Sequence, residues 1–226
     1  MAFKVEEYIR EDASNPYKKW FDGLSSQAAA KVTVAKLRME LGNVSNIKWF
    51  DGLGEYVVDW GPGYRIYLAK DGETLIVLFG GGTKRGQQRD IDRAKELLAE
   101  YKARKKAMTA KSNSKHRHKT MALTRNFKET VVQRVQSDAS FAQALLDEAA
   151  TLFLNGEPET ARLILRDLVN ATIGFEQLAA LTAKPSKSLH RMLSATGNPS
   201  MDNLAAIFRA VRERLQVRLQ ARSVAA

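Results

Sequence analysis

The sequence predicts two unlike parts: an α+β N-terminal domain, with helices on a small antiparallel sheet, followed by an all-α domain with a helix-turn-helix. Three observations predict this fold class. Short β-rich runs separated by turn residues occur in the first half, and apolar residues recur at helical spacing through the second. Between them lies a basic stretch with few large apolar residues, which is typical of a linker. We therefore expect domains at 1–107 and 122–226, joined by a flexible basic linker at 108–121.

The first half mixes helix and strand. A short segment of alternating apolar residues occupies 3–9, and Pro16 begins a helical stretch that Gly42 ends. From Ile47 the pattern changes to four β-rich runs, IKWF, EYVVDW, YRIYLA and TLIVLF, separated by the turn sequences DGLG, GPG and DG. These runs predict an antiparallel meander. A last helix is expected over 91–101, ending in KARKKA.

The second half is predicted to be helix throughout. Helical spacing recurs in FKETVVQRVQ, FAQALLDEAATLFL and ETARLILRDLVNATI, with NGEP as a break between the second and third segments. The final part shortens into FEQLAALT, PSKSLHRML and SMDNLAAIFRAVRERL. Two short helices joined by a tight turn and followed by a longer helix are typical of a helix-turn-helix, here expected at about 174–194.

Composition excludes several classes of protein. The 226 residues include no cysteine, which excludes a disulfide framework, a thiol nucleophile and a Cys-based metal site. There is no run of 18 apolar residues and no signal pattern at the start, so we expect a cytoplasmic protein without a membrane partner. The net charge is +11, and residues 108–126 carry five basic residues and no acid. Such an excess favours contact with a polyanion.

No familiar hydrolytic site can be built from residues 1–107. The first histidine is His116, which excludes a histidine-based triad or zinc site there, and GGGTK lacks P-loop spacing. His116 and His118 have no third ligand nearby in sequence, so we expect no metal and no cofactor. Cationic and phenolic groups remain: Lys48, Tyr64, Arg65, Tyr67, Lys84, Arg85 and Arg89.

Such groups can cleave RNA without a metal. Attack by a 2′-OH on the adjacent phosphate needs a base, stabilisation of the phosphate charge, and an acid for the leaving oxygen. The planar donors of Arg65 suit the phosphate, and Tyr67 lies on the same face of its strand. Lys or Tyr can transfer the protons only where the site shifts their pKa. The alternative is that these are ordinary solvated cations of strands and loops.

The second helix of a helix-turn-helix enters the major groove, so it must present donors to bases or phosphates. With Leu189 turned to the core, several donors fall mainly on outward faces or in the turn: Lys184, Ser186, Lys187, Ser188, His190 and Arg191. The alternative is a solvated helix of a bundle.

Four stretches of the sequence carry a resemblance to two known families. GPGYRIYLAKDGETLIVLFGGGTKRGQQRDIDRAKELLAEYKARKKA and NPYKKWFDGLSSQAAAKVTVAKLRMELGNVSNIK resemble the two halves of HigB-like addiction-module killer proteins of the RelE/ParE superfamily. MALTRNFKETVVQRV and LILRDLVNATIGFEQLAALTAKPSKSLHRMLSATGNPS, within 121–226, resemble the HigA-like antidote proteins. The resemblance implies a type II toxin and its antitoxin joined in one chain, toxin first.

The resemblance implies a ribosome-dependent mRNA interferase that the C-terminal part neutralises within the chain. It also implies that the C-terminal part represses its own promoter, so the partners are mRNA on the ribosome and operator DNA. By position, Arg65 and Lys84 are the first catalytic candidates. Tyr67, Gln87 and Arg89 are secondary, and Lys48, Tyr64 and Arg85 are RNA-binding candidates. We also expect a homodimer, since two chains can exchange partners where docking within one chain is blocked.

Two departures from the family pattern leave alternatives open. Val57 stands where an arginine is common, and WFDGLGEY stands where a GVxE-like sequence is usual. Either change could weaken cleavage, so one alternative is an inactivated toxin retained in a DNA-binding transcriptional repressor. The other is a ParE-like toxin that inhibits gyrase and lacks nuclease chemistry.

Overall fold

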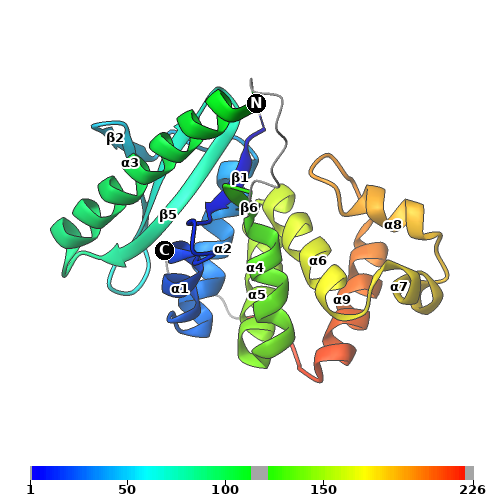
Figure 1. The fold of residues 1–226 in the computed structure, drawn as a ribbon. Coiled ribbons are helices and arrows are strands. Elements are labelled where there is room, and N and C mark those ends of the chain that lie inside the picture. The colour runs from blue at the N-terminus through cyan, green and yellow to red at the C-terminus, as the bar shows by residue number, and fades with distance from the viewer. Residues whose placement is uncertain (1, 113–121, 222–226) are drawn as a thin grey trace. The chain divides into compact units, whose positions relative to one another are not determined.

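The computed structural model describes residues 2–112 and 122–221, which form nine helices and six strands (Figure 1). The chain divides into two compact units. Unit 1 is built from Met1–Leu24 and Gly42–Glu129, and unit 2 from Ser25–Leu41 and Thr130–Ala226. Each unit therefore takes a segment from both halves of the sequence.

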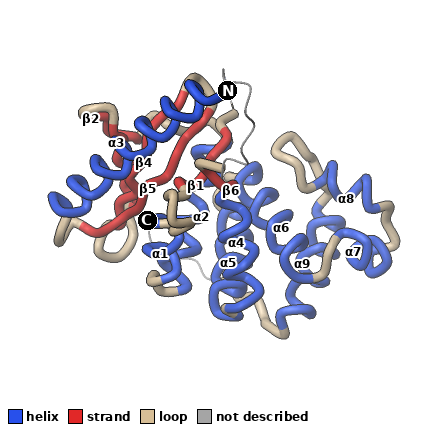
Figure 2. The backbone as a smooth tube through the Cα atoms, viewed as in Figure 1, coloured by secondary structure: helices blue, strands red, loops and turns tan. Residues whose placement is uncertain are grey.

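A six-stranded sheet, drawn in red in Figure 2, forms the centre of unit 1. Its spatial order is β2-β3-β4-β5-β1-β6. Strands β2 to β5 form an antiparallel meander, β1 pairs with β5 in parallel, and β6 pairs with β1 in the antiparallel direction. The strand bounds are β1 Lys4–Tyr8, β2 Ile47–Phe50, β3 Leu53–Val58, β4 Tyr64–Asp71, β5 Leu75–Thr83 and β6 Thr124–Asn126.

Two helices of unit 1 pack on this sheet. Helix α1 (Pro16–Asp22) starts with a proline in its first turn, is capped by the Asn15 side chain, and contacts β5 and β1. Helix α3 (Gln87–Ser112) packs over a core rich in aromatic rings, including Tyr67 and Tyr101. The core side chains of the strands under α3 lie on one face of the sheet, and this face carries the candidate site described below.

Unit 2 is helical, and its segment from the first half of the sequence is α2 (Ser26–Glu40). Helix α2 packs against α5 and α6, and ten of its fifteen residues are buried. Arg38 donates to both carboxylate oxygens of Glu157, and Lys31 forms an ion pair with Glu148 at 2.8 Å. The other helices are α4 Phe127–Ser137, α5 Ala139–Leu154, α6 Pro158–Thr172, α7 Phe175–Thr182, α8 Ser186–Met192 and α9 Met201–Leu215.

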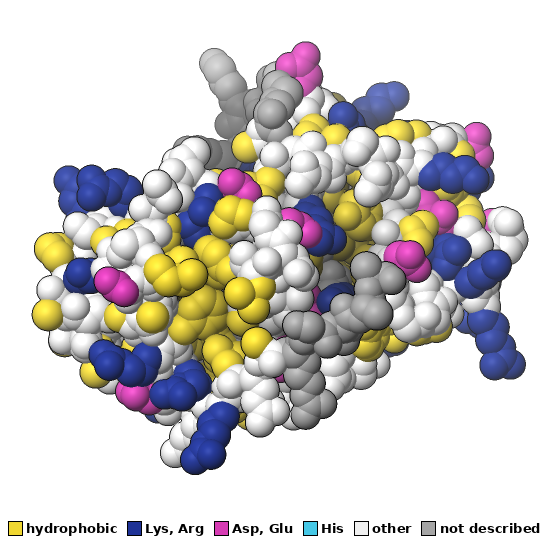
Figure 3. Space-filling model, turned by 180° about the vertical axis from the view of Figure 1, so that it is seen from behind, with side chains coloured by type: hydrophobic (Ala, Val, Ile, Leu, Met, Phe, Trp, Pro, Cys, Tyr) yellow, Lys and Arg dark blue, Asp and Glu magenta, His cyan; other side chains and the backbone are white. Residues whose placement is uncertain are grey.

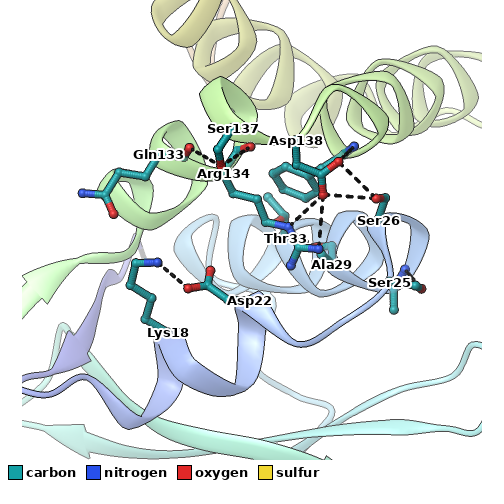
Figure 4. A network of polar contacts seen from close by, with 12 residues as sticks. Lys18, Asp22, Ser25, Ser26, Ala29, Thr33, Gln133, Arg134, Ser137 and Asp138 are labelled. Carbon is teal, nitrogen blue, oxygen red and sulfur yellow. Dashed lines mark hydrogen bonds and ion pairs between the residues drawn. The ribbon is translucent and has the colours of Figure 1, made fainter.

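Asp138 connects α2 to the start of α5 (Figure 4). Its carboxylate accepts from the backbone N–H of Phe141 at 2.9 Å, which caps α5, and from the Ser26 hydroxyl at 3.2 Å. Arg134, at the end of α4, lies 3.4 Å from the same carboxylate. One acid thus joins three helices of unit 2.

The predicted fold class, an α+β domain followed by an all-α domain, is wrong. The protein is a mixed α/β protein, in which β1 and β5 are parallel and the second half contributes the strand β6. Alternation of apolar residues shows that a strand exists but not which strand it pairs with. The sequence TRN of β6 is polar and too short to show a period.

Helix boundaries also differ from prediction. The helical stretch expected from Pro16 to Gly42 is two helices, because Ser25 caps a new helix α2. Helix α3 continues to Ser112 and so enters the predicted linker 108–121; the rest of that linker, 113–121, lies outside the described residues.

Within residues 2–112 and 122–221, every helix is too short or too polar to traverse a lipid bilayer.

Candidate functional site

A buried carboxylate, Glu55, lies at the centre of the candidate site. It is 4% exposed, and its Oε1 lies 3.3 Å from Nε of Arg65 and accepts a hydrogen bond of 2.8 Å from the Gln87 amide. Arg65 also donates through Nη1 to the carbonyl oxygen of Gly63 at 3.0 Å. The Glu55 carboxylate therefore has a fixed cation and a fixed amide donor beside it.

Strand register brings these groups together. Glu55 pairs with Tyr67, and Val57 pairs with Arg65, in the antiparallel ladder of β3 and β4. Because side chains alternate between faces, these four lie on one face of the sheet. Gln87 reaches the same face from the first turn of α3.

Glycines on β5 leave room for an acid on α3. Gly82 pairs with Arg65, and a Cβ at Gly82 would collide with the carboxylate of Asp90. Asp90 can therefore approach the strand closely, which no larger residue at position 82 would permit. The acid lies one helical turn into α3, after Gly86, whose φ of 144° favours glycine.

Tyr67 is the buried phenol of the site. It is 1% exposed, and its hydroxyl makes no hydrogen bond of normal geometry to any described residue. Burial raises the pKa of Tyr67, and the Glu55 and Asp90 carboxylates raise it further. The phenol lines a cavity of about 70 Å³ together with Trp20, Asp90 and Arg93 among others. Since the hydroxyl stays protonated at neutral pH, it can donate a hydrogen bond but cannot act as a base.

An open depression beside the site carries exposed cations. It has a volume of about 580 Å³ and is lined by Lys84, Gly86, Gln87, Gln88, Arg89 and Ile91. Lys84 and Arg89 are exposed, and the Arg89 side chain lies only loosely, at 3.9 Å, from Asp90. Because Gln87 lines the depression and also bonds to Glu55, an anion bound there would lie next to the buried carboxylate.

The structure brings together most of the predicted residues of unit 1. Arg65, Tyr67 and Gln87 surround Glu55, while Lys84 and Arg89 line the adjacent depression. The others lie around this group. Lys48 is exposed and pairs with Glu55 across β2 and β3, Tyr64 begins β4 on the opposite face, and Arg85 is exposed in the turn before α3.

Sequence reasoning missed Glu55 and Asp90. The available signal for Glu55 was an acid between apolar residues in the run LGEYVV, on the face that Leu53 occupies. A charged residue at an inward position of a strand is unusual and often functional. Asp90 gave no such signal, because acids in the first turn of a helix are common.

The helix-turn-helix prediction falls on α7 and α8. The turn between them contains Ala183 in the left-handed conformation, φ 50°, and Leu189 and Leu193 are buried. Lys187, His190 and Arg191 are exposed, whereas Lys184, Ser186 and Ser188 are half-buried. Lys and Arg side chains stand out along the left edge of Figure 3, over the helical unit.

Two sets of contacts determine which side chains of α8 are available at the surface. The His190 ring stacks on Phe175 with centroids 3.6 Å apart, so this histidine packs against α7. Buried Arg162 of α6 donates to the carbonyl oxygens of Ser194 and Ala195, at 3.0 and 2.6 Å, and fixes the chain after α8. Lys187 and Arg191 are therefore the predicted donors that remain available on the surface of α8.

Among the described residues, no group of three or more His, Cys, Asp or Glu side chains could hold a metal ion. His116 and His118 lie outside those residues.

Comparison with known proteins gives one informative relationship. No protein-family model matches the chain, and no solved structure matches it. An uncharacterized protein of Haemophilus influenzae is 37% identical over 86 residues, which are 37% of this chain and 87% of that protein. The chain belongs to the same family as this Haemophilus protein. The Haemophilus protein is uncharacterized, so the relationship brings no activity to this chain.

The chemistry available at the site follows from its donors and acceptors. Glu55 can accept a proton, Arg65 can stabilise an anionic phosphate, and Gln87 and Tyr67 can donate hydrogen bonds. Lys84 and Arg89 supply exposed positive charge on one side. This set suits a reaction in which negative charge develops on a phosphate while a hydroxyl loses its proton.

Proposed function

We propose that the chain is a type II toxin–antitoxin fusion. Its N-terminal part is a ribosome-dependent mRNA interferase, and its C-terminal part neutralises that activity and binds operator DNA as an autorepressor. The observation that carries the proposal is the Glu55–Arg65–Gln87 cluster beside the depression lined by Lys84 and Arg89. A base and a phosphate-binding guanidinium lie together there without need of a metal.

The cleavage step balances with these residues. The 2′-oxygen attacks the adjacent phosphorus as Glu55 takes the hydroxyl proton, and Arg65 stabilises the charge on the phosphate oxygens. The bond from phosphorus to the 5′-oxygen breaks, and this oxygen receives a proton from solvent water, while the exposed Lys84 ammonium binds the phosphate and Glu55 returns its proton to solvent. The products are a 2′,3′-cyclic phosphate and a 5′-hydroxyl end.

Two exchanged elements support neutralisation within the chain. The C-terminal half supplies β6, whose residues Arg125 and Thr124 contact Glu7 and Glu6 of β1. In the other direction, α2 of the N-terminal half packs on α5 and α6. The C-terminal half thus holds the N-terminal half at two separate elements, and this contact is the means of neutralisation in our proposal.

The surface of α8 supports operator binding. Lys187 and Arg191 are exposed on a helix that follows a tight turn, which suits contact with bases or phosphates in a groove.

One observation favours the alternative of an inactivated toxin. Val57 lies directly across from Arg65 and is 42% exposed, so it contributes no donor where a second guanidinium would stand beside the first. In that case the protein would keep only operator binding, and Val57→Arg would restore cleavage.

Induction in bacterial cells tests the proposal. We would compare the full chain with residues 1–129, which retain β6 but lack α5 and α6, and with residues 1–129 carrying Arg65→Ala and Lys84→Ala. The proposal expects growth arrest and new mRNA 5′ ends from residues 1–129 alone. Arrest that persists in the double variant without mRNA cleavage would contradict the nuclease and favour gyrase inhibition. Absence of arrest in every strain would favour the inactivated toxin.

A further inference from the structure

The turn between β3 and β4 carries a pair of stacked aromatic side chains. The rings of Trp60 and Tyr64 lie 6.2 Å apart between centroids, with an angle of 18° between their planes. Both side chains are half-buried, so part of each ring faces solvent. Nearly parallel rings at a surface can extend their stack with a third flat ring.

The turn holds this pair in a fixed conformation. The N–H of Trp60 donates to the Val58 carbonyl oxygen at 2.9 Å, and the N–H of Gly63 donates to the Trp60 carbonyl oxygen at 3.1 Å. Gly61 and Gly63 have φ of 57° and 73°, a conformation that other residues adopt at a cost. Little freedom therefore remains to be lost when a ligand stacks on the pair.

The pair lies at the same end of the sheet as the phosphate-binding cations. Arg65 follows Tyr64 directly, and its Nη1 reaches back to the carbonyl oxygen of Gly63 within the turn. Tyr64 also pairs with Thr83 across β4 and β5, and Lys84 follows Thr83. The Tyr64 and Arg65 side chains leave β4 on opposite faces, so a single strand that reaches both the rings and the cations passes over the end of the sheet.

We propose that the Trp60–Tyr64 pair is a base-binding subsite for single-stranded RNA, which takes the base of the nucleotide next to the phosphate held by Arg65 and Lys84. This inference rests on the proposed function and adds its substrate subsite. Single strands are bound through cations on the backbone and aromatic rings under the bases, and this end of the sheet offers both. A duplex does not fit, because its bases are already stacked on one another.

Fluorescence anisotropy on the full chain tests the subsite. The probe is a fluorescein-labelled single-stranded RNA of seven nucleotides, used intact and in a series with one base removed at each position in turn. We expect one abasic position to weaken binding by about 5- to 100-fold, the range for loss of one base–aromatic stack. The unaltered protein should bind that abasic RNA weakly, and Trp60→Leu should bind the intact RNA with the same low affinity. Trp60→Leu should also bind the intact and the abasic RNA equally well.

Matched variants separate a subsite from a general effect on folding. Trp60→Phe keeps a flat ring and should restore most of the lost affinity. Trp49→Leu removes an exposed tryptophan of β2 and should leave the affinities for the intact and the abasic RNA unchanged. If Trp60→Leu keeps full affinity for the intact RNA, or still distinguishes the abasic RNA as the unaltered protein does, the subsite is overturned.

The outcomes also separate this inference from the proposed function. If Arg65→Ala with Lys84→Ala weakens RNA binding but Trp60→Leu does not, the subsite fails and the proposed function stands. If the double variant binds RNA as well as the unaltered protein does, the proposed function fails and the subsite fails with it. If the unaltered full chain binds no RNA, the subsite fails, while neutralisation within the chain stands.

Discussion

At the scale of single residues, the proposed cleavage depends on Glu55. The carboxylate is buried and has Arg65 and Gln87 beside it, so in the proposed reaction a base lies next to a guanidinium that can bind a phosphate. Glu55→Gln keeps the shape of the side chain but removes its basicity. We expect RNA cleavage to fall by about 10²- to 10⁴-fold, the usual contribution of a general base, while RNA affinity changes little.

Single-turnover cleavage and anisotropy on the same protein check this expectation. Glu55→Ala is a useful companion, because it removes the carboxylate without offering a substitute amide. A Glu55→Gln variant that cleaves at the unaltered rate would show that Glu55 only positions Arg65.

Tyr67 allows a prediction on stability. Its buried hydroxyl forms no hydrogen bond of normal geometry, and the nearby Glu55 carboxylate keeps Arg65 and Gln87 as partners when the hydroxyl is removed. We expect Tyr67→Phe to leave the free energy of unfolding unchanged or to raise it by up to about 1 kcal/mol. Urea unfolding measures the change, and a loss of more than about 1 kcal/mol would reveal a hydrogen bond that the structure does not show.

The candidate residues show what a sequence can and cannot predict at this scale. Alternation along β4 correctly placed Arg65 and Tyr67 on one face. Glu55 was not predicted, because its role depends on the pairing of β3 with β4, and the sequence of one strand does not show which strand it pairs with. The surroundings of Tyr67 depend on α3 as well, which comes from another part of the chain.

At the scale of elements, the second half of α3 is anchored by two acids. Asp71 accepts from Lys105 and Tyr101, and Glu100 accepts from Arg10 and Tyr8. Hydrogen bonds from Lys105 and Tyr101 lower the pKa of Asp71, and those from Arg10 and Tyr8 lower the pKa of Glu100. A lowered folded-state pKa stabilises the fold above the unfolded-state pKa, and this contribution is lost as the pH falls through the folded-state pKa.

We therefore expect the free energy of unfolding to fall as the pH is lowered from about 5 to about 3. Asp71→Asn should flatten this dependence, because the variant no longer takes up a proton at position 71. Urea titrations at several pH values measure the slope. Asp92→Asn, at an exposed acid on α3, serves as the control, and equal slopes for Asp71→Asn and the unaltered protein would contradict this expectation.

The second element to test is α8. Lys187→Ala and Arg191→Ala should each weaken operator binding. For a side chain that contacts a phosphate, the slope of log affinity against log salt concentration should become shallower by about one. His190→Ala should instead lower stability, since this ring stacks on Phe175. Filter binding at several salt concentrations, with thermal unfolding alongside, distinguishes the two effects. Salt slopes that do not change in any variant would contradict a groove-binding role for α8.

Elements differ in how well their sequence predicts them. The four β-rich runs and the helices of the second half are present where periodicity placed them. The parallel pairing of β1 with β5 was not predicted, because it joins segments far apart in sequence. Nor was β6, whose three residues are strand only because β1 offers an edge to pair with.

At the scale of the whole molecule, the two halves of the sequence exchange elements. A protease site inserted within residues 113–121 of the full chain would allow one cut after purification. We expect the two fragments to elute together, because β6 pairs with β1 and α2 packs on α5 and α6. Arg38→Glu should promote separation, and adding Glu157→Arg should reverse it, since the two side chains form an ion pair.

Size-exclusion chromatography with mass measurement follows the separation of the two fragments. The same measurement on the uncut chain shows whether it is the expected homodimer. Lys95→Glu, in an exposed ion pair with Asp51 inside unit 1, is the matched control and should not promote separation. Fragments that separate at once in the unaltered protein would contradict the exchange of elements.

In the reaction that we propose, unit 1 cleaves RNA by attack of a 2′-hydroxyl on the adjacent phosphate. The most direct test gives residues 1–129 a ribosome-bound mRNA whose cleaved position carries either a 2′-hydroxyl or a single 2′-deoxy substitution. The account predicts cleavage of the first mRNA to a 2′,3′-cyclic phosphate and a 5′-hydroxyl end, and no cleavage at the substituted position of the second. Equal cleavage of both mRNAs, or products with a 5′-phosphate, would contradict it.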